Sequence, residues 1–330
     1  MNFSNLNKVV LTASLLATSF SYADSDRPLL SLSVSQSGGT ALNNEGSLDT
    51  RTPASQSRVL PIWGDEARAR GYDIPEPFGA SYSYMNLRQD IIVDKIGFST
   101  PAWPEISDVV KIDVGHTREK SETHMLKLDS WVFPFFNVYG LYGKTKGTSR
   151  SVLNDVRADF GGGFVIPVAQ NEIFNLDFEG KTYGGGFTLA GGYNQFFGTF
   201  DLNYTKTNLD ILDGDIKALV ISPRVGYEFI FEPLISGQGN TKLQVWTGAM
   251  YQDITQRFRG DVSKLNLPPN FEQMVGIFGG DIKFDVEQHL AHKWNQTVGA
   301  RLEVTRNFNV ITELGFNNRN SFFVSGEFRF

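Results

Sequence analysis

The last ten residues of the chain, SFFVSGEFRF (residues 321–330), alternate between two kinds of side chain. Every second position is apolar or glycine: Phe322, Val324, Gly326, Phe328 and Phe330. The positions between them are mostly polar and include Glu327 and Arg329. Because successive side chains of a β-strand point to opposite faces, this pattern predicts a strand with one apolar and one largely polar face.

The same alternation continues toward the N-terminus. Residues 308–316 alternate in the same way, and the polar run Asn317 to Asn320 separates them from the last strand, which predicts a hairpin. The strand before that ends at the turn Arg306-Asn307, and further alternating runs reach back to Phe78. We therefore predict an all-β fold, an antiparallel up-and-down barrel of about 12 strands, with roughly 10 to 14 compatible with the pattern.

Alternation also bears on whether such a barrel is soluble or spans a membrane. Beyond the first 23 residues, no stretch has the length and apolarity of a transmembrane helix. A membrane barrel keeps its mean hydropathy low because only alternate side chains face lipid. Aromatic residues form 13% of the chain and occur near the ends of predicted strands, as at Phe78, Trp131 and Trp294. Such rings favour the membrane interface, so we predict a transmembrane barrel.

The order of the turns assigns them to two sides. An even strand count puts both ends of the barrel on the side of Phe330, together with the predicted turns Glu119 to Glu122 and Gly147 to Asp155. The opposite side receives Trp131 to Phe135 and the longest predicted loop, Asp253 to Trp294.

The N-terminal residues have the features of an export signal. Lys8 precedes the apolar run Val9 to Phe20, and Ser21-Tyr22-Ala23 is a cleavable pattern of small residues. We predict a signal peptide at residues 1–23, a periplasmic segment at 24–77 and the barrel at 78–330. The segment at 24–77 is rich in Ser, Gly and Asn without a sustained period, and it is read equally as a plug in the lumen or as a tail.

Composition excludes some classes of function. The chain has no Cys, so it has neither disulfides nor a thiolate metal site. Its net charge of −6 becomes −7 when Lys8 is removed with the signal, which leaves no basic surface for nucleic acid.

With these features the chain resembles Gram-negative outer-membrane β-barrel proteins, of a porin-like kind without an assigned subfamily. The resemblance rests on the cleavable signal, the alternating strands and the terminal run ending in Phe330. It implies residence in the outer membrane, contact with its lipid and recognition by the barrel-assembly machinery. Residues 321–330 are similar to the assembly signal of that family, which would be carried by Phe322, Val324, Gly326, Phe328 and Phe330.

Charged residues at alternate positions of the predicted strands are expected to face the lumen, because charge is costly against lipid. Basic and acidic residues are nearly balanced among them, which favours cross-strand ion pairs inside a narrow barrel over a strongly ion-selective pore. The predicted lumen-facing residues are Lys111, Asp113, Lys127, Asp129, Arg157, Asp159, Asp201, Arg224, Glu228, Lys242, Arg301, Glu303, Glu313, Glu327 and Arg329.

Catalytic or metal chemistry has few candidates. His116 and His124 flank a predicted turn and lack the following residues of a phospholipase pattern, so we predict no catalytic residue and no cofactor. His289 and His292 would share one face of a helix, but a third metal ligand is missing, and we predict no metal site.

The first functional hypothesis is therefore a narrow channel or transporter for small solutes. Its alternatives are an outer-membrane enzyme acting on lipid or peptide and a non-conducting structural or surface-interaction barrel.

Overall fold

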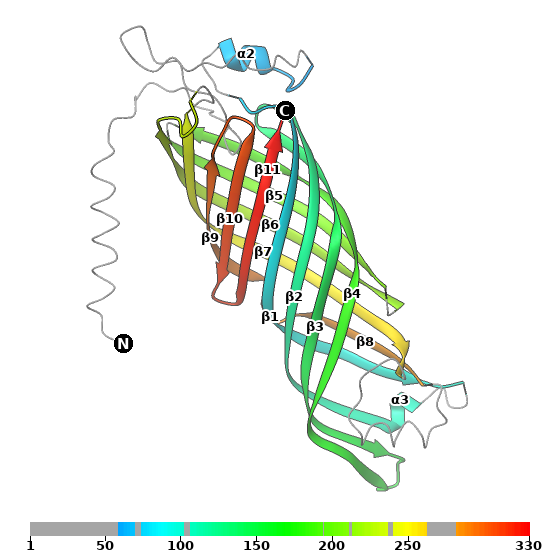
Figure 1. Cartoon of the computed structure of the whole chain (residues 1–330). Coiled ribbons are helices and arrows are strands. Elements are labelled where there is room, and N and C mark those ends of the chain that lie inside the picture. Colours follow the sequence, from blue (N-terminus) through cyan, green and yellow to red (C-terminus); the bar gives the residue numbers. More distant parts are fainter. Residues whose placement is uncertain are drawn as a thin grey trace, which may run out of the picture.

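The computed structural model describes residues 59–69, 74–101, 106–193, 195–210, 213–236, 240–262 and 282–330. These residues form one antiparallel sheet of eleven strands and two short helices (Figure 1). The helices are α2 (Gly64–Ala69) and α3 (Ile106–Val109). The strands are β1 (Phe78–Ser99), β2 (Val110–Phe133), β3 (Phe136–Asp159), β4 (Val165–Tyr193), β5 (Phe196–Leu209), β6 (Asp213–Phe231), β7 (Thr241–Asp261), β8 (Lys283–Leu290), β9 (Trp294–Glu303), β10 (Phe308–Phe316) and β11 (Arg319–Arg329).

The sheet closes on itself because the first and last strands pair. β1 and β11 are in register from Gly79 opposite Arg329 to Gln89 opposite Arg319. The backbones of Phe78 and Phe330 also exchange hydrogen bonds of 3.0 and 2.9 Å. All strands except β8 take part in this ring, so ten of the eleven strands form it. The predicted all-β, up-and-down barrel is thus confirmed, with an even strand number within the predicted range. We call the end with Phe78 and Phe330 the terminal end and the opposite end the distal end.

The ring is completed differently at its two ends. β8 and β9 run in the same direction along β7, which pairs with β9 near the terminal end and with β8 near the distal end. They therefore act as one strand interrupted at residues 291–293. On the other side, β9 pairs with the short hairpin β10–β11, whereas β8 pairs directly with β1. The prediction of one long loop from Asp253 to Trp294 is wrong, because the distal part of β7 and all of β8 lie within this range. Its residues 263–281 lie outside the described part of the chain.

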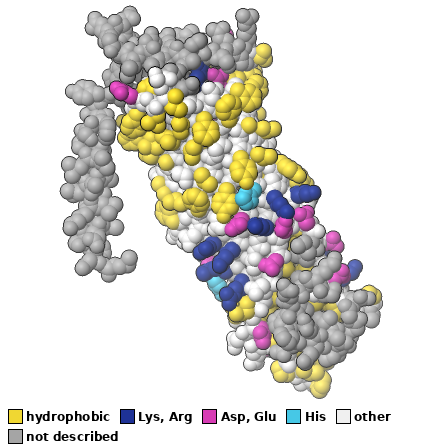
Figure 2. Space-filling view, in the orientation of Figure 1, with side chains coloured by type: hydrophobic (Ala, Val, Ile, Leu, Met, Phe, Trp, Pro, Cys, Tyr) yellow, Lys and Arg dark blue, Asp and Glu magenta, His cyan; other side chains and the backbone are white. Residues whose placement is uncertain are grey.

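The outer surface changes character along the barrel axis. Near the terminal end, large apolar side chains such as Tyr82, Leu126 and Phe328 are exposed over the strands. Toward the distal end, the same outer face carries charged residues such as Arg88 and Lys120 (Figure 2). The strands are long enough for both zones, since β4 has 29 residues and crossing a bilayer takes about 9–11. We call the first zone the apolar belt and the second the distal extension.

The length of these strands corrects the predicted turns. The predicted turns Glu119 to Glu122 and Gly147 to Asp155 lie inside β2 and β3, so they are not turns. The two short strands predicted on either side of Glu119 to Glu122 are one strand. The true turn between β2 and β3 lies at the terminal end, where Trp131 N–H donates to Pro77 O at 2.8 Å. Trp131 to Phe135 therefore lies at the end opposite to the predicted one. Gly161 to Gly163, all with positive φ, form the distal turn after β3.

The segment before the barrel is described only in part. Residues 1–58 lie outside the described part, so the signal-peptide prediction and most of the predicted segment 24–77 are not described. Residues 59–69, with α2, lie against the terminal end, where Ile62 N–H donates to Val132 O at 2.8 Å and Trp63 contacts Phe133 (Figure 1). None of the helices in the described ranges is long and apolar enough to cross a membrane.

The apolar belt yields a direct prediction. Leu126→Lys places an ammonium group on the exposed surface of the apolar belt opposite Tyr82, and we expect the free energy of unfolding in lipid vesicles to fall by about 2–4 kcal/mol. Gln170→Lys, on the exposed surface of the distal extension, should change it by less than about 0.5 kcal/mol. Urea titration of both variants measures the difference. Equal effects would mean that the belt does not face lipid.

Candidate functional site

The interior of the barrel is layered, and β1 displays the layers in order. Its inward side chains run from the terminal to the distal end as Ser81, Ser83, Met85, Leu87 and Gln89, all of which line one internal cavity. Along β1 the inward side chains therefore change from small polar hydroxyls to apolar side chains and then to an amide. The next inward residue, Ile91, belongs to an apolar core.

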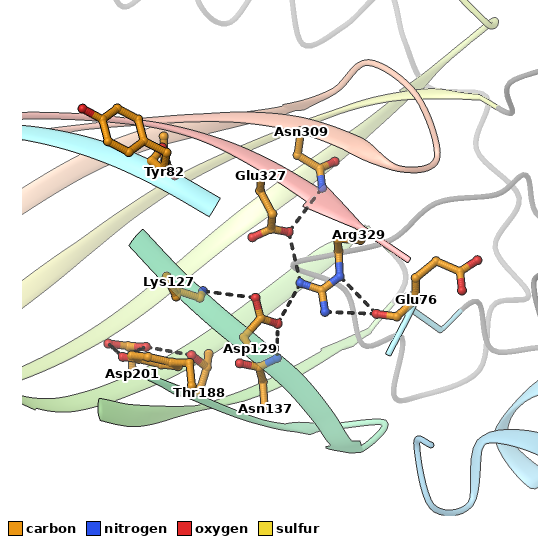
Figure 3. Close-up of polar contacts among 12 residues, drawn as sticks. Glu76, Tyr82, Lys127, Asp129, Asn137, Thr188, Asp201, Asn309, Glu327 and Arg329 are labelled. Atoms are coloured by element: carbon orange, nitrogen blue, oxygen red, sulfur yellow. Dashed lines mark hydrogen bonds and ion pairs between the residues drawn. The ribbon is translucent and has the colours of Figure 1, made fainter. Parts of the chain in front are cut away.

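A buried ionic layer closes the terminal end of this cavity. The guanidinium of Arg329 lies 2.9 Å from the Asp129 carboxylate and 3.2 Å from that of Glu327 (Figure 3). Arg301 approaches Glu327 to 2.8 Å, and the Asn137 amide donates to Asp129 at 2.7 Å. The side chains of the four charged residues are at most 4% exposed. We call Asp129, Arg301, Glu327 and Arg329 the terminal ionic layer.

Two features of the chain make room for this layer and cover it. Gly79 is required because a Cβ atom there would lie 2.4 Å from an Asp129 carboxylate oxygen and 2.6 Å from an Arg329 nitrogen. From the terminal side, the backbone carbonyl of Glu76 accepts hydrogen bonds of 3.1 and 3.0 Å from Arg329 (Figure 3). The Glu76 carboxylate pairs with Arg306 at 2.8 Å. The buried residues 74–77 therefore lie across the terminal end of the lumen.

The cavity itself has a volume of about 390 Å³. Its charged wall groups are paired: Arg224 makes a bidentate contact with Glu313 at 2.6 and 3.0 Å, and the Trp246 indole N–H donates to Glu313 at 2.7 Å. Tyr139 donates to the Asp201 carboxylate at 2.8 Å. Much of the remaining wall is apolar, formed by Met85, Leu87, Met125, Leu141, Phe197, Val220, Met250, Ile254, Ile311 and Phe323.

A second polar layer lies at the distal end of the cavity, level with the charged outer surface of β1 and β2. Gln256 donates from its side-chain amide to the Glu119 carboxylate at 2.7 Å, and Gln288 donates in turn to Gln256. Gln89 stands between Arg319 and Glu119 in the register of β11, β1 and β2. Burial raises the pKa of Glu119, against the lowering effect of the side-chain hydrogen bonds from Gln256 and Gln89. We call Gln89, Glu119, Gln256, Gln288 and Arg319 the distal polar layer.

Beyond the distal polar layer the interior is filled. Phe258 and Val156 are 0% exposed, and the rings of Phe258 and Phe178 lie 5.7 Å apart. Ile106 of α3 is buried in the same cluster. The distal extension therefore has an apolar interior and a charged exterior, the reverse of the belt.

The structure places most of the predicted lumen-facing residues on the interior face. These are Lys127, Asp129, Asp201, Arg224, Glu228, Lys242, Arg301, Glu303, Glu313, Glu327 and Arg329.

Four others lie elsewhere, on the outer face of the distal extension: Lys111, Asp113, Arg157 and Asp159. Their sequence neighbours Val110, Val156 and Ala158 are buried in the distal core. The polar side chains therefore point to water outside the barrel, because here the apolar positions face inward. Of the predicted assembly signal, Phe322, Phe328 and Phe330 are exposed on the belt, and Val324 and Gly326 are partly buried on the same face.

The histidines lie on the outside of the barrel. His124 is hydrogen-bonded to Tyr82 at 2.7 Å, and His116 lies 3.2 Å from Asp90. His289 belongs to β8, not to a helix, and its ring nitrogen lies 2.6 Å from Asp94, whereas His292 is exposed beyond the strand end. In the described ranges, no three His, Asp or Glu side chains cluster as a metal site would require.

Sequence reasoning missed Glu119 and Arg319, since both were placed in predicted turns. A usable signal was present, because Glu119 precedes Lys127 and Asp129 by eight and ten residues along β2, which is even spacing. Arg319 is spaced in the same way from Glu327 and Arg329 along β11. Even spacing along an unbroken strand keeps side chains on one face.

Comparison with known proteins gives a weak likeness to barrels. No family model matches the chain, and no curated protein matches it. Among solved structures, it is similar to the transport unit of the autotransporter AIDA-I from Escherichia coli, with 9% identity, 77% of this chain and 90% of that chain covered, and a TM-score of 0.34. The chain is also similar to the Ralstonia pickettii toluene transporter TbuX, with 10% identity, 78% of this chain and 90% of that chain covered, and a TM-score of 0.28. Similarity to the CymD monoaromatic hydrocarbon channel has 8% identity, covers 78% of this chain and 89% of that chain, and has a TM-score of 0.27. Likeness at this level carries no argument about function.

Proposed function

We propose that the protein is an outer-membrane barrel that passes a small solute through its internal cavity, with the terminal end in the periplasm. The apolar belt supports the membrane location, since β11 with 11 residues has the length that a tilted strand needs to cross a bilayer. The observation that carries the proposal is the cavity of about 390 Å³ enclosed by the barrel wall.

Passage requires both ends of the cavity to open. The terminal ionic layer and residues 74–77 close one end, and the distal core closes the other. The contacts of Glu76 with Arg329 and Arg306 favour the plug interpretation of the N-terminal segment over that of a free tail.

Planar-bilayer recording of the purified protein tests the proposal. We expect brief, discrete current steps separated by long closed periods, because the structure is closed at both ends. Current that stays at zero across the whole range of applied voltage would contradict solute passage.

The plug interpretation can be tested separately by chemical labelling, since the chain has no Cys. Ser83→Cys places one thiol on the cavity wall behind the terminal ionic layer. Removing residues 24–77 should speed its reaction with a small water-soluble thiol reagent by about tenfold or more, because each 1.4 kcal/mol of lost closure raises the open fraction about tenfold. Lys120→Cys on the exposed surface is the control and should react equally fast with and without the segment. If the thiol of Ser83→Cys reacts at the same rate with and without residues 24–77, the segment is a tail and not a plug.

A specific observation favours a second candidate, a non-conducting surface-interaction barrel. The distal extension is filled by its own core and carries charge outside, as a rigid display surface would. The silent recording described above is the result expected for this candidate. The enzyme alternative lacks such support, since no His lines the cavity within the described residues. Hydrolysis of lipid or peptide by the purified protein would show that the enzyme alternative is correct.

A further inference from the structure

Two residues at the distal end of the cavity, Gln89 and Arg319, have buried side-chain atoms without a hydrogen-bond partner in the described residues. Gln89 is 4% exposed and lines the cavity, and its side-chain oxygen has no hydrogen-bond partner in the described residues, whereas its NH2 group faces the Glu119 carboxylate. Nε of Arg319, on the neighbouring strand, is also unpaired. Glu119, on the other side of Gln89, already accepts from Gln256.

Such atoms are costly when nothing satisfies them. A buried polar group without a hydrogen bond costs about 1–3 kcal/mol relative to its paired state. An apolar side chain at position 89 would continue the apolar column of Met85, Leu87 and Ile91 without this cost. The amide therefore indicates a partner that enters the cavity.

We propose that the cavity binds a small amphipathic molecule whose uncharged polar head, a carboxamide or an alcohol, pairs with Gln89. The head must both donate and accept, because the Gln89 amide offers one oxygen and one NH2 group. The proposal rests on the solute passage proposed above and names the class of that solute.

The charge balance of the site excludes a charged head. Arg319 and Glu119 flank Gln89 with opposite charges. Lower in the cavity, Arg224 is matched by Glu313, and the Asp201 carboxylate accepts from Tyr139, Thr188 and Asn203. A carboxylate or ammonium head would meet a like charge beside its counter-charge and would lose its hydration, whereas a neutral head pays only a small desolvation cost.

The cavity wall accommodates an apolar body. Between the two polar layers it presents flexible and aromatic side chains such as Met85, Met125 and Phe323. Met side chains adapt to irregular apolar ligands, and the volume of about 390 Å³ is within the usual range of small-molecule sites. An eight-carbon chain with its head at Gln89 is a suitable probe.

The test compares three ligands with the same body: octanamide, N,N-dimethyloctanamide and octanoate. Calorimetric titration of the full mature protein in lipid nanodiscs, with empty nanodiscs as blank, should give octanamide about tenfold tighter binding than either analogue. Gln89→Met, which keeps the length of the side chain without its amide, should remove the preference of octanamide over its dimethyl analogue. Gln296→Met makes the same exchange on the exposed surface of β9 and should retain it.

Each outcome decides the proposal. No binding above the blank, or a head-group preference that survives Gln89→Met, would overturn it, and water would then satisfy the amide. If Gln89→Met fails to give the heat-modifiable gel mobility of a folded barrel, Gln89→Leu repeats the test, and octanamide against octanoate on the unaltered protein already decides the charge preference. Binding with silent bilayers would contradict solute passage alone, whereas conductance without head-group preference would contradict this proposal alone.

Discussion

Replacing Arg329 with methionine is expected to lower the free energy of unfolding by about 3–5 kcal/mol, because it leaves Asp129 and Glu327 buried without their shared counter-charge. The same change removes both hydrogen bonds to the Glu76 carbonyl, so the N-terminal segment should also detach from the terminal end. Urea titration in lipid vesicles measures the first effect, and faster thiol labelling of Ser83→Cys measures the second.

Arg257→Met is the matched control for this prediction. Arg257 also pairs with a carboxylate, that of Asp285 at 2.9 Å, but its side chain is 40% exposed on the distal extension. An exposed pair contributes at most about 1 kcal/mol. A loss at Arg329 no larger than the loss at Arg257 would mean that the terminal ionic layer is hydrated.

Replacing Phe258 with alanine is expected to cost about 3–5 kcal/mol, since its ring is 0% exposed and packs against Phe178. The damage should be confined to the distal extension, so added protease should cut β7 or β8 while the belt-embedded part of the barrel stays intact. The cut sites can be mapped by mass spectrometry. Leu126→Ala, on the belt, is the control, because that side chain is exposed and its loss leaves no internal cavity. Similar losses in both variants would contradict a packed interior in the distal extension.

The architecture could be predicted from sequence because a period of two is a local property. The terminal run was interpreted with the correct faces, and Phe330 and Phe328 are exposed on the belt as that pattern requires. Where the barrel leaves the belt, the period persists but its meaning reverses. Leu126 is apolar and faces outward, whereas Val110 on the same strand is apolar and faces the distal core.

Sequence pattern alone does not reveal this reversal. The register of β2 shifts between Asp113 and Thr117, so the inward positions change parity along one strand. The outward charges of residues 118–122 then form a polar run that has the composition of a turn. For the same reason Lys111 and Arg157 were assigned to the lumen, and Glu119 was not. The cavity and the buried amide of Gln89 depend on pairings between strands far apart in sequence, such as Gln256 with Glu119, which no local pattern contains.

For a barrel in the outer membrane, as proposed above, the seam between β1 and β11 makes insertion an all-or-none event. A polypeptide that lacks β11 would have two unpaired strand edges inside the hydrocarbon. Each edge has a row of backbone N–H and C=O groups that water cannot reach, and each such group costs several kcal/mol. Chains that lack β11 are therefore unstable in the bilayer. Only a chain that includes β11 can close the wall.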